Sequence, residues 1–119
     1  MNKEEVLTKI NEYISVKDEQ IIEQVICTEN FTFTNLRDSL IGLGKIVEEN
    51  FESNYYIVSI PAGIAERNTA ILLILWQKRK VSIFAYAKEG LINQHTADIA
   101  IDKVIESITQ RDGESIFKE

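Results

Sequence analysis

The chain has 119 residues, 45% of them hydrophobic, which is enough for one domain with a packed core and no stabilising disulfide. Its formal net charge of −6 disfavours a nucleic-acid partner, because a phosphate backbone repels an acidic surface. No apolar run approaches the roughly 20 residues of a membrane span, and the N-terminus lacks the apolar core of a signal peptide, so we expect a cytoplasmic protein.

Two helices are predicted before residue 28. Residues 3–16 carry apolar side chains at helical spacing, with Glu4 and Glu5 in the first turn, where the helix dipole favours acids. Asp18 is placed to cap a second helix over residues 19–27, and a strand over residues 24–28 is the alternative. The next stretch, residues 28–34, predicts either a loop that buries Phe31 and Phe33 or a short edge strand.

A third helix is predicted from Asn35 to about residue 50, with Phe51 on or near its apolar face. Gly42 and Gly44 interrupt its pattern. They indicate close packing against the sheet or a local break, because glycine is unfavourable inside a helix. Gly42–Lys45 is not a phosphate-binding turn, since the nucleotide fingerprint needs a preceding strand and a glycine where Val47 stands.

Three strands follow. Residues 55–60 form the first and end at Pro61 and Gly63. Two apolar runs, residues 69–76 and 81–87, then predict a hairpin around the basic turn Gln77–Lys80. Register with Trp76 opposite Val81 makes both faces of this hairpin apolar, so both faces need a cover.

The last helix is predicted from Thr96 to Asp112, where Gly113 stops it, and residues 113–119 are expected to be a disordered tail. The predicted fold class is α+β: a single domain over residues 1–112, with a three-stranded antiparallel meander, helices packed on it and the order α-α-α-β-β-β-α. The small side chains of Ala70, Ala85 and Ala87 favour that face as the seat of the third and last helices.

No catalytic, metal-binding or cofactor-binding residues are predicted. His95 is the only histidine and Cys27 the only cysteine, which excludes a multi-histidine metal site and an internal disulfide. Gln94, His95 and Thr96 are a weak anion-site candidate at a helix start. The three glutamates at 48, 49 and 52 are a weak divalent-cation candidate, because they lack the loop pattern of a calcium site.

The predicted contact surface is the second face of the hairpin with its rim. Its residues are Ile71, Leu73, Leu75, Phe84 and Tyr86, with Trp76, Lys78 and Arg79 near the edge. A patch of large apolar side chains left open on a monomer is an association site, although the first two helices of the chain are the alternative cover.

The leading hypothesis is a non-enzymatic interaction module that forms a homodimer through this face and binds another protein. A small-ligand sensory or carrier domain, with a pocket lined by Tyr55, Tyr56 and Tyr86, is the alternative. A nucleic-acid binder of the winged-helix kind is less favoured, because the helix before the basic turn offers few basic side chains. No nucleic-acid or membrane partner is expected.

Overall fold

The computed structural model describes residues 1–17, 20–29, 31–112 and 117–118. The elements are, in chain order, α1 (Lys3–Asn11), β1 (Ile22–Cys27), α2 (Phe33–Ile41), β2 (Lys45–Asn50), β3 (Tyr55–Ala62), the short 3-10 turn η2 (Ile64–Glu66), β4 (Asn68–Gln77), β5 (Lys80–Ala87), α3 (Thr96–Asp112) and the two-residue β6 (Phe117–Lys118). The α+β class is therefore confirmed. The predicted cap at Asp18 and the rest of the predicted tail lie outside the described residues.

The strands form one antiparallel sheet with the order β2-β3-β4-β5-β1-β6 in the described part of the chain. The β4–β5 hairpin has the predicted register, with Trp76 paired to Val81. Its turn holds only Lys78 and Arg79, because Gln77 and Lys80 already pair with each other. The strand predicted at residues 55–60 runs two residues further, to Ala62, and pairs with β4 along its length.

The predicted three-stranded meander, with the order α-α-α-β-β-β-α, is wrong, because two segments expected to be helical are strands. The first is β1, which pairs antiparallel with β5 from Ile22 to Cys27. Apolar residues in this segment fit one face of a helix, but three of the four are isoleucine or valine, whose branched Cβ atoms favour a pleated strand. The pairing with β5 inserts the segment into the sheet and overrides the helical pattern.

The second corrected segment is the end of the helix predicted over residues 35–50. Thr32 caps α2 by accepting a hydrogen bond from the Asn35 backbone N–H at 3.0 Å, and the helix ends at Ile41. Residues 42–44 form the break, and β2 follows at the edge of the sheet. At Gly44 the backbone passes so close to β3 that a Cβ atom would collide with the Ser59 carbonyl oxygen.

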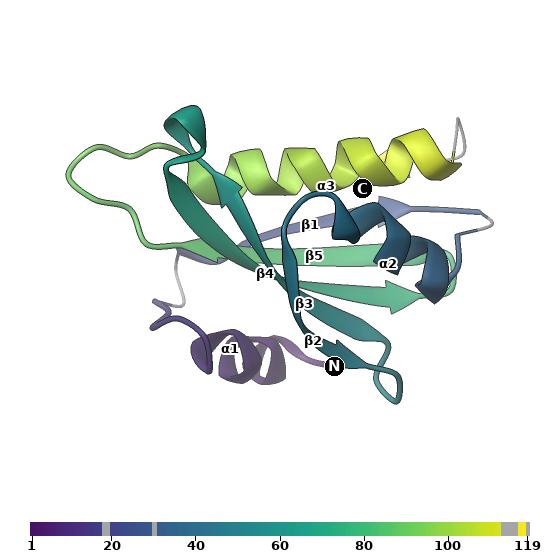
Figure 1. The fold of residues 1–119 in the computed structure, drawn as a ribbon. Coiled ribbons are helices and arrows are strands. Elements are labelled where there is room, and N and C mark those ends of the chain that lie inside the picture. Colours follow the sequence, from purple (N-terminus) through teal and green to yellow (C-terminus); the bar gives the residue numbers. More distant parts are fainter. Residues whose placement is uncertain (18–19, 30, 113–116, 119) are drawn as a thin grey trace.

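Each face of the sheet has its own helical cover (Figure 1). The helices α2 and α3 pack on the face that carries Ala70, Ala85 and Ala87, as predicted for the third and last helices. On the opposite face lies α1, whose Val6 and Ile10 are buried against the strands. The molecule therefore has three layers, with one core above the sheet and a second core below it. No helix in the described part of the chain is long and apolar enough to cross a membrane.

Candidate functional site

In the structure, the residues of the predicted contact surface lie in two separate places. Five of them are buried in the core on the α1 side of the sheet and are at most 9% exposed: Ile71, Leu73, Leu75, Phe84 and Tyr86. Their neighbours in the same core are Val6 and Ile10 of α1 and Ile14 and Val16 of the segment after it. A partner can reach this face only if α1 moves away.

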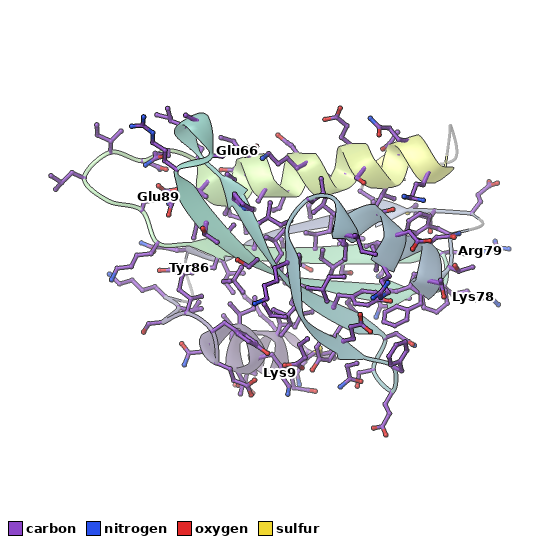
Figure 2. All side chains as sticks on the ribbon, viewed as in Figure 1. Lys9, Glu66, Lys78, Arg79, Tyr86 and Glu89 are labelled. Atoms are coloured by element: carbon purple, nitrogen blue, oxygen red, sulfur yellow. The ribbon has the colours of Figure 1, made fainter. Side chains whose placement is uncertain are left out.

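The other three predicted residues lie at one end of the sheet. Lys78 and Arg79 are exposed at the hairpin turn and project from the end of the molecule opposite Glu89 (Figure 2). Trp76 is partly buried, and its indole N–H donates a hydrogen bond to the Phe31 carbonyl at 2.7 Å. This bond ties the hairpin to the segment that enters α2.

Backbone hydrogen bonds bring two further segments to the hairpin turn. The Trp76 N–H donates to the Asn54 carbonyl at 2.8 Å, so the β2–β3 turn lies against the end of β4. The Thr28 N–H donates to the Arg79 carbonyl, also at 2.8 Å, so the end of β1 is fixed to the same turn. Segments that are far apart in the sequence thus form one continuous surface.

An aromatic stack lies on this surface. The Phe33 ring stacks on Tyr56 with centroids 4.3 Å apart, meets Phe51 edge-on at 5.6 Å and lies 6.4 Å from Trp76. The Phe51 ring is 69% exposed, whereas Tyr56 is buried. We call this surface the aromatic–basic end; it comprises Phe33, Phe51, Tyr56, Trp76, Lys78, Arg79 and Lys80.

The inner part of the stack is rigidly held. The Tyr56 hydroxyl donates to the Phe33 carbonyl at 3.0 Å, and burial raises the pKa of Tyr56 to about 12, so the hydroxyl keeps its proton. Beside the stack, Arg37 of α2 donates to Glu49 of β2 at 2.8 Å, and this hydrogen bond raises the pKa of Arg37. Glu49 therefore neutralises the Arg37 charge. Among the residues that the structure describes, no salt bridge neutralises the positive charges of the hairpin turn.

A second polar cluster centres on Glu48. A β-bulge at Val47 turns Glu48 toward α1, where its carboxylate accepts hydrogen bonds from Tyr13 at 2.7 Å and from Tyr55. Burial raises the pKa of Glu48, but the two tyrosine hydroxyls and the nearby Lys9 charge outweigh this, so the pKa lies below its ordinary value. An ionised, fully bonded carboxylate is poorly suited to proton transfer near neutral pH. Glu48 instead ties α1 to the sheet.

The glutamates considered as a cation site are separated by the pleat of β2. Glu48 faces α1, whereas Glu49 faces Arg37 of α2 on the other side of the sheet. Within the described residues no group of histidine, cysteine, aspartate and glutamate side chains is arranged to hold a metal ion.

The opposite end of the molecule holds a cavity of about 580 Å³. It is lined by Tyr86, the segment after α1, the β5–α3 loop and the first turn of α3. The tyrosines of the predicted pocket do not meet there, since Tyr55 lines a separate cavity of about 360 Å³ and Tyr56 lies in the other layer.

The anion site considered at Gln94, His95 and Thr96 is filled by the chain itself. The Glu89 carboxylate accepts hydrogen bonds from the backbone N–H groups of Thr96 at 2.9 Å and Gln94 at 3.1 Å. Burial raises the pKa of Glu89, but hydrogen bonding to the Thr96 side chain, to these two backbone groups and to Asn68 outweighs burial, so the pKa lies below its ordinary value. An internal carboxylate thus occupies the start of α3.

Sequence reasoning missed Phe33 and Phe51 as surface residues. The expected helix over residues 35–50 assigned Phe51 to a helical apolar face, whereas it follows a strand and stands in the β2–β3 turn. The signal that could have placed Phe51 correctly is the break at Gly42 and Gly44. A strand that follows this break returns along the sheet edge, so Phe51 falls in the turn at the end of that strand.

Comparison with protein-family models, curated proteins and solved structures found no match for this chain.

Proposed function

We propose that this protein is a non-enzymatic interaction module that binds another protein at its aromatic–basic end. The exposed Phe51 ring carries the proposal, because a large apolar side chain held in place by a packed neighbour is a typical binding hot spot. Loops built on a rigid sheet position such contacts with little loss of conformational entropy on binding.

The neighbouring charges agree with this role. Aromatic and arginine side chains are enriched in protein interfaces, and this end combines Phe51 and Trp76 with the exposed Arg79. Self-association through the face under α1 would first require that helix to leave, so we place the contact at the aromatic–basic end instead. A homodimer stays a prediction.

Affinity capture from a lysate of the cells that make the protein tests the proposal. Phe51→Ser removes the exposed ring, and Leu91→Ser is the matched control, because Leu91 is fully exposed in the β5–α3 loop at the opposite end. We expect a protein that is recovered with wild type and with Leu91→Ser, but reduced about tenfold or more with Phe51→Ser. Equal recovery of every protein by wild type and Phe51→Ser would contradict the proposal.

The cavity of about 580 Å³ favours a second function, the binding of a small ligand, since its volume is typical of ligand sites. A ligand that binds only the folded chain raises its melting temperature. A metabolite panel that produces no shift for the full chain would count against this second function.

A further inference from the structure

We infer that the aromatic–basic end recognises an acidic protein segment that carries an apolar side chain. This inference rests on the proposed function and adds the chemistry of the partner. In it, the apolar side chain packs on the Phe51 and Phe33 rings, and the acidic side chains meet the hairpin turn at Lys78 and Arg79.

The distribution of charge is the first argument. Lys78, Arg79 and Lys80 are consecutive and exposed, and no salt bridge joins them to another residue in the described part of the chain. The whole chain carries a net charge of −6. An acidic segment is therefore repelled by the net charge of the molecule and attracted at this turn, which gives both orientation and specificity.

The second argument is the hydrogen bond that joins the segment with the ring to the segment with the charges. The 2.8 Å hydrogen bond from Trp76 N–H to the Asn54 carbonyl joins the end of β4 to the β2–β3 turn. Phe51 belongs to that turn, and Lys78 follows Trp76 by two residues. One short segment can therefore reach the ring and the positive charges together.

The backbone at Lys78 offers a test of the inference. Its φ angle is +53°, in the left-handed region that glycine and asparagine adopt at least cost. A tight hairpin turn commonly requires such an angle. Replacing Lys78 by glycine therefore removes the charge at the tip and keeps the turn.

An acidic protein segment fits this end better than a nucleic acid does. Phe51 is the one ring of the stack that is largely exposed, whereas single-stranded nucleic acids use a series of exposed rings, one for each base. The net charge of −6 also disfavours a long phosphate backbone that would extend across the molecule, whereas a short acidic segment meets only the hairpin turn and the ring beside it.

Binding of synthetic polymers to the full chain, measured by fluorescence anisotropy, tests the inference. The probe is a copolymer of glutamate and tyrosine; polyglutamate, a copolymer of lysine and tyrosine and a single-stranded oligonucleotide are compared with it. We expect the glutamate–tyrosine copolymer to bind about tenfold or more tightly than polyglutamate, because only the copolymer offers an apolar anchor. Its affinity should fall with added salt.

Variants locate the binding. Phe51→Ser should weaken binding of the glutamate–tyrosine copolymer about tenfold, and the double variant Lys78→Glu with Arg79→Glu should weaken it further. The control with the same charge change, Arg67→Glu with Lys88→Glu, alters exposed residues at the opposite end and should bind like wild type. Lys78→Gly should raise the melting temperature yet weaken binding, which separates loss of contact from loss of fold.

Preference for the lysine–tyrosine copolymer or the oligonucleotide would overturn the inference, as would equal weakening by the two charge variants. A protein captured through Phe51, combined with no binding of the acidic copolymer, would refute the inference and leave the proposed function standing. If no captured protein depended on Phe51, the proposed function itself would be refuted.

Discussion

At the scale of the residue, Glu48 shows how one carboxylate can hold a layer of the protein in place. It lies on β2 and accepts hydrogen bonds from Tyr13, which follows α1, and from Tyr55 on β3. The hydrogen bond to Glu48 also raises the pKa of Tyr13 to about 12, so the donor keeps its proton in ordinary solution conditions. The cluster is thus formed by an ionised acceptor and protonated donors.

This arrangement predicts a pH-dependent contribution to stability. The pKa of Glu48 in the folded chain lies below its ordinary value of 4.5, so near that pH the unfolded chain binds more protons than the folded chain. The contribution is therefore complete above pH 4.5 and is lost as the pH falls through the folded-state pKa. Urea denaturation of Glu48→Gln should show a loss of about 1–3 kcal/mol at neutral pH that shrinks in acid.

Tyr13→Phe is the control for Glu48→Gln, because it removes one donor and leaves the carboxylate with Tyr55. It should be destabilised less, and it should retain part of the acid dependence. Identical pH profiles for wild type and Glu48→Gln would show that Glu48 does not stabilise the folded state.

At the scale of the element, the break between α2 and β2 decides the path of the chain. The two glycines of this break have different surroundings. Gly42 has ordinary right-handed helical angles and open space around its Cα, whereas Gly44 lies against the β3 backbone at Ser59 and Ile60. Only Gly44 needs the absence of a side chain.

A matched pair of substitutions tests this difference. Gly44→Ala should cost about 1–3 kcal/mol of unfolding free energy, because the added carbon forces β2 away from β3. Gly42→Ala should leave the stability unchanged or raise it by up to about 1 kcal/mol, since alanine restricts the unfolded chain more than glycine does. Both are measured by chemical denaturation; equal effects would place the close approach elsewhere.

At the scale of the whole molecule, the sheet separates two hydrophobic cores, one on each of its faces. The central strands are apolar on both faces and need a cover on each. The helices α2 and α3 cover one face and α1 covers the other, where Leu73 of β4 is fully buried. The apolar side chains on both faces of the central strands are buried by helices of the same chain. The large apolar side chains expected at an interface between chains are therefore buried in the core that α1 and the segment after it cover.

Leu73→Asp separates an internal core from an interface. In this structure it places a charge beneath α1, and we expect a loss of more than about 3 kcal/mol, seen as unfolding by circular dichroism. Leu91→Asp, at an exposed position, should leave the fold intact. A folded, monomeric Leu73→Asp protein obtained from a dimeric wild type, measured by light scattering, would instead restore the interface hypothesis.

The sequence was informative where a local pattern admits one structure. The register of the β4–β5 hairpin followed from two continuous apolar runs around a short basic turn, and α3 followed from its helical spacing and the cap region at Thr96. The segment that became β1 was ambiguous, because four apolar residues in a six-residue stretch suit one face of a helix as well as a strand. Pairing with β5 resolved it.

The candidate site was predictable only in part for a related reason. Trp76, Lys78 and Arg79 are neighbours in the sequence, so their common location could be read directly. Phe33 and Phe51 join them through the β1–α2 segment and the β2–β3 turn, whose positions depend on the complete strand order. The order of strands in a sheet cannot be read from the pattern of a single sequence.

By itself, the sequence determined the α+β class, the central hairpin with its two apolar faces and the positive turn, because these depend on residues close together in the chain. Tertiary structure alone decided that β1 and β2 are strands, that α1 covers the second face and that Phe51 stands beside the basic turn. These features depend on contacts between distant segments, where the free energy of burying apolar surface exceeds the small local preferences for helix or strand.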